Sequence, residues 1–164
     1  MTMRHHDSDI RTFLIAETFL FIRRAIQIPG VTRIALIGSL ITGKANPKDA
    51  DILVTVDDEA DLAPLATAAR KLKGAAQGRN KGADVFLANP AGHYIGRICQ
   101  WRECRPGIRI ACDARHCGNR HYLHDDLASV NLDSQLIAKP PLEVWPATIC
   151  RVSVADDLLS RLSF

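Results

Sequence analysis

Hydrophobic residues recur along the first half of the chain with the spacing of helices. Between residues 8 and 29 the apolar positions that keep helical spacing are Ile10, Phe13, Leu14, Phe21, Ile22 and Ala25. Ser8 suits the N-cap of this helix, and the Pro29-Gly30 pair ends it. A second stripe, formed by Leu62, Leu65, Ala69 and Leu72, predicts a helix that Asp61 caps and Gly74 ends.

Three apolar runs in the same half predict strands. Residues 32–37 are almost continuously apolar, which is typical of a central strand covered on both faces. The second run covers residues 51–56, and the third covers residues 82–88 and carries one acid, Asp84. This order of helices and strands predicts an α/β or α+β fold with a mixed central sheet flanked by helices.

The pattern changes after Asn89-Pro90, where periodicity fades and Gly, Arg, Cys and His become frequent. We therefore expect two segments, a core of residues 1–92 and an appendage of residues 93–164, packed together as one unit. After Pro140-Pro141 the appendage closes with a predicted strand at 142–145 and an amphipathic helix at 156–162.

Composition fits one sizeable core. The 164 residues are 47% hydrophobic and 24% charged, as in ordinary globular domains. No apolar run is long enough to span a bilayer, and the first residues lack the apolar stretch of a secretory signal, so we expect a cytoplasmic protein. The net charge of +3 is too small to indicate nucleic-acid binding by itself.

Candidate chemistry lies between the first two predicted strands. Gly38 and Ser39 follow the first strand, where small residues let backbone N–H groups approach a polyphosphate closely. Asp49 and Asp51 stand one residue apart at the start of the next strand, so their carboxylates point to the same face and can share divalent ions. The pattern indicates a site for a nucleoside triphosphate (NTP) with divalent cations.

This part of the chain combines an apolar strand, Gly38-Ser39, a loop of about ten residues and Asp49-x-Asp51 followed by apolar residues. In this order the features resemble the DNA polymerase β-like nucleotidyltransferase superfamily, in particular its small, minimal members. The motif runs from 32 to 56 and the resemblance covers about 8 to 89. Asp84 stands where the family takes a third carboxylate from a neighbouring strand. Leu40, Ile41 and Lys48 differ from the polar, basic or small residues common there.

The resemblance implies transfer of a nucleoside monophosphate from an NTP, such as ATP, to an acceptor hydroxyl, with release of pyrophosphate. Asp49 and Asp51 would bind Mg²⁺ ions that bridge the triphosphate, Gly38 and Ser39 would seat its phosphates, and Asp84 would activate the acceptor. The acceptor is a small molecule, an RNA or a protein. Membrane binding is not expected.

Four of the five cysteines form two pairs with the same internal spacing, Cys99-x4-Cys104 and Cys112-x4-Cys117. Four thiolates can enclose a tetrahedral Zn²⁺, which would stabilise a segment too polar to fold on its own core. Structural zinc pairs more often have two intervening residues, so buried thiols without metal are the alternative.

Three other interpretations remain open. The first is a noncatalytic nucleotidyltransferase-like module that binds a nucleotide or a partner protein, as in the antitoxin half of paired systems. The second is a zinc-stabilised RNA-binding protein whose working surface is the arginine-rich stretch from Arg97 to Arg120. In the third, Gly38-Ser39 is an ordinary turn and the three acids are solvated surface residues.

Overall fold

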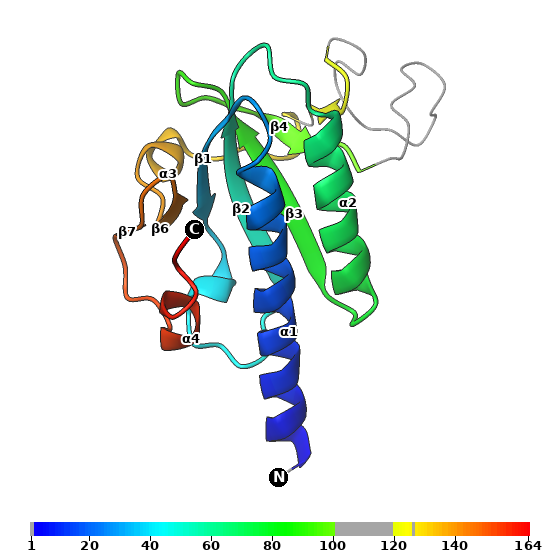
Figure 1. Cartoon of the computed structure of the whole chain (residues 1–164), viewed down its shortest axis with the longest axis vertical. Coiled ribbons are helices and arrows are strands. Elements are labelled where there is room, and N and C mark those ends of the chain that lie inside the picture. Colours follow the sequence, from blue (N-terminus) through cyan, green and yellow to red (C-terminus); the bar gives the residue numbers. More distant parts are fainter. Residues whose placement is uncertain (1, 101–119, 126) are drawn as a thin grey trace.

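A seven-stranded mixed sheet forms the centre of the computed structural model, which describes residues 2–100, 120–125 and 127–164 (Figure 1). The strands are β1 (Val31–Leu36), β2 (Asp49–Val56), β3 (Gly82–Ala88), β4 (Tyr94–Ile98), β5 (Leu123–His124), β6 (Leu142–Trp145) and β7 (Ile149–Cys150). Their order across the sheet is β5-β4-β3-β2-β1-β6-β7. Only β2 and β3 pair in parallel among these strands. The predicted mixed sheet flanked by helices is confirmed.

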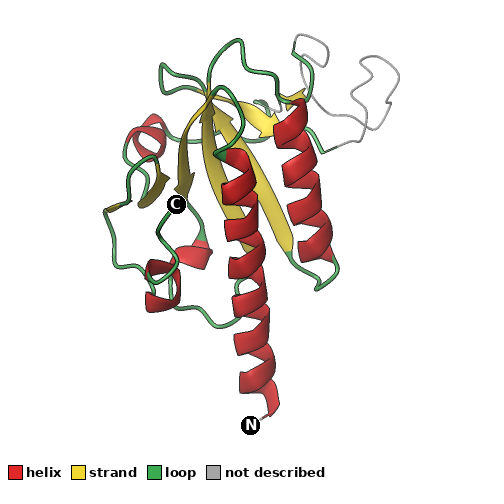
Figure 2. Ribbon diagram, viewed as in Figure 1, coloured by secondary structure: helices red, strands yellow, loops and turns green. Residues whose placement is uncertain are grey.

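Two long helices, α1 (Thr2–Ala25) and α2 (Ala63–Gln77), lie side by side over one face of the sheet (Figures 1 and 2). Because β2 and β3 are parallel, the chain needs a long crossover between them, and α2 supplies it. The short helices are η1 (Ser39–Ile41, a 3₁₀ turn), α3 (Ser134–Ala138) and α4 (Asp156–Leu159). Strands β4 to β7 come from the second half of the chain and extend the same sheet on both sides.

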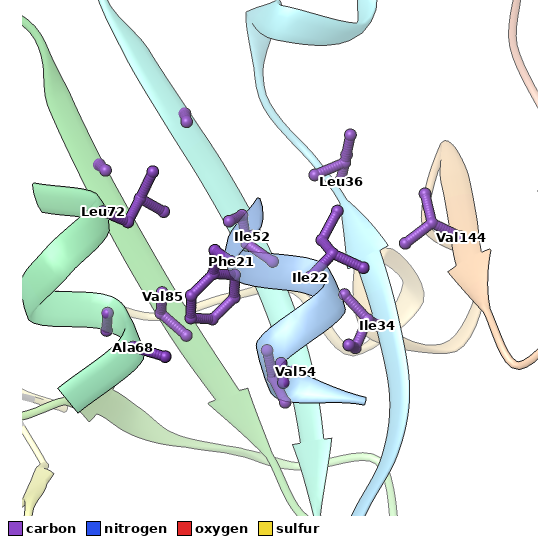
Figure 3. Packing of buried hydrophobic residues seen from close by; sticks show 14 of the residues in the cluster. Phe21, Ile22, Ile34, Leu36, Ile52, Val54, Ala68, Leu72, Val85 and Val144 are labelled. Carbon is purple, nitrogen blue, oxygen red and sulfur yellow. The ribbon is translucent and has the colours of Figure 1, made fainter. Parts of the chain in front are cut away.

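The main core lies between the sheet and the two long helices (Figure 3). Phe21 and Ile22 of α1 are fully buried, and Leu72 of α2 packs beside them. Ile52 and Val54 of β2 supply the facing side of this cluster. Burying each such side chain contributes about 1.5–3 kcal/mol, so this face holds most of the apolar stabilisation.

The opposite face of the sheet carries a smaller apolar cluster, because successive strand residues point to opposite faces. Ala35 and Leu53 are buried there with Ala88 and Tyr94, and Ile137 of α3 covers them. Residues Asp49, Asp51 and Asp84 alternate with core residues of β2 and β3 and therefore share this face. The smaller cluster stabilises the face without extending over the acids.

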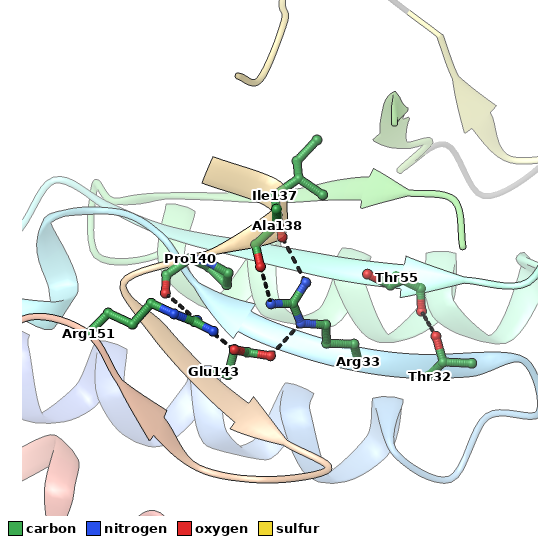
Figure 4. Close-up of polar contacts among 8 residues, drawn as sticks. All are labelled: Thr32, Arg33, Thr55, Ile137, Ala138, Pro140, Glu143 and Arg151. Carbon is green, nitrogen blue, oxygen red and sulfur yellow. Dashed lines mark hydrogen bonds and ion pairs between the residues drawn. The ribbon is translucent and has the colours of Figure 1, made fainter. Parts of the chain in front are cut away.

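An ion-pair network also stabilises this second face (Figure 4). Arg33 of β1 donates to the carboxylate of Glu143 on β6 through Nε at 2.5 Å and to the carbonyl of Ile137 through Nη1 at 2.7 Å. Arg151 donates to the other oxygen of Glu143 at 2.5 Å. These bonds lower the pKa of Glu143, the hydrogen bond from Arg33 most strongly. The network joins β1, β6 and the end of α3.

Several predicted boundaries are wrong although the elements exist. Helix α1 begins at Thr2, so Ser8 lies inside it and does not cap it. Helix α2 begins after Leu62, while the Asp61 carboxylate accepts from the Ala63 amide at 3.0 Å, and the helix continues through Gly74. The closing helix is limited to α4, and the strand at 142–145 is confirmed.

Among the described helices, none combines the length and the apolar character needed to cross a membrane.

Candidate active site

Three carboxylates lie on the two parallel strands at the centre of the sheet. Asp51 of β2 is directly opposite Asp84 of β3 in the pairing register, and Asp49 is opposite Gly82. The neighbouring residues Ile52 and Val85 join the core on the helix-covered face. Asp51 and Asp84 therefore share the other face; the sequence had assigned Asp84 to the site by the resemblance alone.

Gly38 lies directly against Asp51. The Ile37 amide donates to the Asp51 carbonyl at 3.1 Å, which carries the end of β1 past the start of β2. A Cβ atom on Gly38 would overlap the Asp51 carboxylate, with Cβ and Cγ of Asp51 only 3.0 Å away. Any larger residue at this position would push the Asp51 carboxylate aside, so Gly38 and Asp51 are in direct contact.

Gly82 has the same relation to Asp49. A Cβ atom on Gly82 would overlap the Asp49 carboxylate, and the Gly82 amide donates to the Lys48 carbonyl at 3.0 Å. Gly82 is a site residue that was not predicted, although its place at the start of the strand that carries Asp84 was a usable signal. The two glycines leave room for both carboxylates of the Asp49-x-Asp51 pair.

Ser39 is exposed at the start of the η1 turn, next to Gly38. Its carbonyl accepts from the amide and the hydroxyl of Thr42 at 3.1 and 2.8 Å. Leu40 and Ile41 are 1% and 3% exposed in the main core. Their burial explains why apolar residues stand at two positions that differ from the family pattern, since they anchor the turn.

The electrostatics of the site centre on Asp51. Burial raises the pKa of Asp51 to about 6, and the negative charges of Asp49 and then Asp84 contribute to the same shift. The carboxylate is still mainly ionised at pH 7, but it is held in an unfavourable state. A bound cation would relieve this repulsion, which makes the three acids a site that favours positive charge.

Arg97 of β4 already supplies one positive charge. Its Nη1 lies 3.5 Å from Oδ1 of Asp84, and both side chains are about 30% exposed. Arg97 pairs with Phe86 across the β3–β4 ladder, so it projects to the same face two residues beyond Asp84. Sequence reasoning counted Arg97 among the arginines of the appendage, and only the strand register brings it to the carboxylates.

The side chains of the site fit magnesium only as a shared ligand of protein and substrate. Within the described residues no three His, Cys, Asp or Glu side chains are close enough together to hold a metal ion by themselves. Magnesium is usually bound by one or two carboxylates together with substrate phosphates, not by an all-protein cage. The hard oxygen donors of Asp49 and Asp51, with the raised pKa of Asp51, fit a site of that kind.

Only one of the four predicted zinc ligands, Cys99, lies among the described residues. Cys99 is 8% exposed at the end of β4, and its amide donates to the Tyr122 carbonyl at 2.6 Å. Cys104, Cys112 and Cys117 lie outside the described residues. Of the arginine-rich stretch, Arg120 donates through Nη2 to two carbonyls after β2, those of Asp57 and Ala60, at 2.8 and 2.9 Å. That contact joins the appendage to the core.

A cavity of about 440 Å³ opens on the second face, away from the acids. Thr32, Arg33, Thr55, Asp57, Asn89 and Ile137 are among the residues that line it. Thr55 lies four residues beyond Asp51 along β2, which corresponds to about 13 Å. The cavity is therefore separate from the carboxylates, and we assign no role in the candidate site to it.

Comparison with protein-family models, with curated proteins and with solved structures finds no match.

Proposed function

We propose that the protein is a nucleotidyltransferase that transfers a nucleoside monophosphate from an NTP to an acceptor hydroxyl. The observation that supports this proposal most is the contact of Gly38 with Asp51, combined with the register that sets Asp84 opposite Asp51. The Gly38-Ser39 turn thereby contacts Asp51, and Asp49 and Asp84 lie on the same face of the sheet. Phosphoryl chemistry needs this combination, because phosphates and cations must be held together.

Each residue of the site has a defined role in this proposal. Gly38 and Ser39 offer backbone N–H groups and an exposed hydroxyl to the triphosphate. Asp49 and Asp51 would hold magnesium, which when bound neutralises the charge that develops on the triphosphate. Asp84 orients the acceptor hydroxyl and accepts its proton.

The reaction balances with these groups. The acceptor oxygen forms a bond to the α-phosphorus while the bond from that phosphorus to the bridging oxygen breaks. Pyrophosphate leaves with the electron pair of the broken bond, and the hydroxyl proton passes to Asp84. Arg97, with Nη1 3.5 Å from Oδ1 of Asp84, holds the direction of this carboxylate. We place the reaction in the cytoplasm, which supplies NTP and magnesium.

Loss of either magnesium-binding carboxylate tests the proposal. The wild type, Asp49→Ala and Asp51→Ala are incubated with each α-labelled NTP, Mg²⁺ and RNA, protein or small alcohol acceptors. We expect transfer to fall at least about 100-fold in both variants, because several kcal/mol of charge stabilisation are lost. Asp58→Ala removes an exposed acid beyond the other end of β2 and should behave as the wild type. Unchanged transfer in both site variants would refute the assignment.

The second candidate is a noncatalytic module that binds a nucleotide or a partner protein. The Arg97–Asp84 ion pair favours it, because the guanidinium lies against a carboxylate oxygen of Asp84 that the acceptor hydroxyl would have to reach. Calorimetric titration with a nonhydrolysable ATP analogue separates the two. Magnesium-dependent binding without any transfer would make this candidate the better one.

The zinc site stays a prediction for the appendage, together with the RNA-binding interpretation that depends on it. Elemental analysis of the purified protein should find about one equivalent of zinc if Cys99 and the three other predicted ligands bind it. A Cys99→Ser variant should then lose both the metal and stability. Metal-free protein of undiminished stability would leave the cysteines as core thiols.

A further inference from the structure

The loop of residues 42–48 joins the Gly38–Ser39 turn to Asp49. It is hydrogen-bonded to residues that pack with the C-terminal segment, which here means Ala155 and the helix α4 that follows it. The Ile41 carbonyl accepts from the Ala155 amide at 3.0 Å, just before the loop begins. Lys44 and Lys48 are exposed on the loop, next in sequence to the candidate site. The C-terminal segment therefore contacts the chain between the Gly38–Ser39 turn and Asp49, and this stretch sets how far the turn lies from Asp49 and Asp51.

Arg11 of α1 makes the second tie. Its Nη1 donates to the Lys44 carbonyl at 3.1 Å, while Nε and Nη2 donate to both carboxylate oxygens of Asp157 at 2.7 and 2.8 Å. One guanidinium thus joins α1 to a loop 33 residues away and to α4, which is 146 residues away. A bidentate ion pair of this kind fixes the orientation of the guanidinium as well as its distance from the carboxylate.

The burial of Arg11 makes the contact hard to replace. Arg11 is only 6% exposed, so removal of Asp157 leaves an arginine charge out of water without its partner. Leu158, the next residue of α4, is fully buried in the main core and anchors the helix independently of the ion pair. Asp157 fixes the guanidinium that donates to the Lys44 carbonyl, so loss of its charge should loosen the loop while Leu158 keeps α4 in place.

We propose that Arg11 and Asp157 are positioning residues that hold loop 42–48, with its two exposed lysines, against the polyphosphate of the bound nucleotide. This inference rests on the proposed function. Lysine ammonium groups beside paired carboxylates are suited to a polyphosphate chain, whose charge exceeds what a single divalent cation neutralises. The C-terminal segment is then part of the nucleotide site although it follows the carboxylates by about a hundred residues.

The test compares neighbouring acids of α4. Asp157→Asn removes the charge that holds Arg11, and Asp156→Asn removes an exposed charge next to it. Amide hydrogen exchange is followed along the full chain, and the dissociation constant is measured for Mg²⁺ with a nonhydrolysable ATP analogue. We expect Asp157→Asn to speed exchange of amides 43–46 about tenfold and to weaken nucleotide binding about fivefold. Asp156→Asn should match the wild type in both measurements.

Two further variants separate positioning from general stability. Asp157→Glu keeps the charge and should restore most of the nucleotide affinity, which simple loss of stability would not explain. Lys44→Gln alters an exposed side chain, leaves the carbonyl bond to Arg11 in place and should weaken nucleotide binding without faster exchange.

Three results would overturn the inference. In the first, Asp157→Asn and Asp156→Asn are indistinguishable in exchange and in affinity while the wild type binds nucleotide. In the second, the faster exchange of Asp157→Asn extends evenly through α2, which indicates a loss of global stability. In the third, the wild type binds no nucleotide, and this result alone also refutes the proposed function.

Discussion

The two faces of strand β2 differ in what they stabilise. Ile52 and Val54 point into the large apolar core under α1 and α2. On the other face, Gly38 and Gly82 lie against Asp51 and Asp49, and Asp84, the third acid, pairs with Arg97. The face with Ile52 and Val54 stabilises the folded state by burying apolar surface. The face with Asp49 and Asp51 brings like charges together, and their repulsion lowers the stability of the folded state. Such a cost is expected at functional sites and has no structural benefit here.

The largest expected effects come from neighbouring residues of β2 on opposite faces. Ile52→Ala should lower the free energy of unfolding by about 4 kcal/mol, because it leaves a cavity in the large core. Leu53→Ala should lower the free energy of unfolding by only about 2 kcal/mol. Leu53 belongs to the smaller cluster, which can collapse around the lost volume. Urea unfolding measures both values. A larger loss for Leu53→Ala would contradict the difference between the faces.

The ion-pair network on the second face should contribute less. Glu143→Gln leaves Arg33 and Arg151 without their carboxylate and should lower the free energy of unfolding by about 2 kcal/mol at pH 7. Because the pKa of Glu143 is lowered from 4.5, its stabilisation is complete above that pH and disappears as the pH falls through the native pKa. The difference between wild type and variant should therefore shrink in acid. Glu59→Gln, at an exposed acid, is the control.

Asp51→Asn should act in the opposite direction and raise the free energy of unfolding by about 1 kcal/mol at pH 7, allowing for screening by water. The native pKa of Asp51, about 6, lies above its ordinary value of 3.8. The wild type therefore gains stability as the pH falls from 7 toward 4, and the variant does not. Thermal unfolding across this range measures the difference. A destabilised variant at pH 7 would contradict the repulsion among the three acids.

The smallest change in stability is expected for Arg97→Gln, about 0.5 kcal/mol, because the ion pair with Asp84 is partly exposed. The same substitution removes a positive charge beside the acids, so Mn²⁺ should bind about threefold more tightly. Paramagnetic titration with Mn²⁺ measures the affinity. Lys71→Gln is the control, because it removes an exposed charge on α2, which covers the opposite face of the sheet. This variant should leave the affinity for Mn²⁺ unchanged. Equal tightening in both variants would indicate only a change in net charge.

Sequence periodicity was sufficient to predict the central elements of the fold. Apolar runs predicted strands within two residues of β1 and β2, and apolar stripes predicted α1 and α2, because burial of these faces dominates their stability. Boundaries were less well predicted. Gly74 was expected to end α2, but the helix continues to Gln77 because its neighbours Leu72 and Ala76 are buried in the core. Tertiary packing outweighs the modest helix penalty of one glycine.

By itself the sequence determined the carriers of the candidate chemistry, since Gly38, Asp49 and Asp51 stand in one local motif whose strand alternation fixes their common direction. Only the tertiary structure decided what meets them. The parallel register of β2 and β3 sets Asp84 opposite Asp51, the β3–β4 ladder brings Arg97 to Asp84, and Arg11 reaches Asp157 across the molecule. Each contact joins residues that are distant along the chain. Their pairing depends on how the whole sheet and its helices pack, which no local pattern encodes.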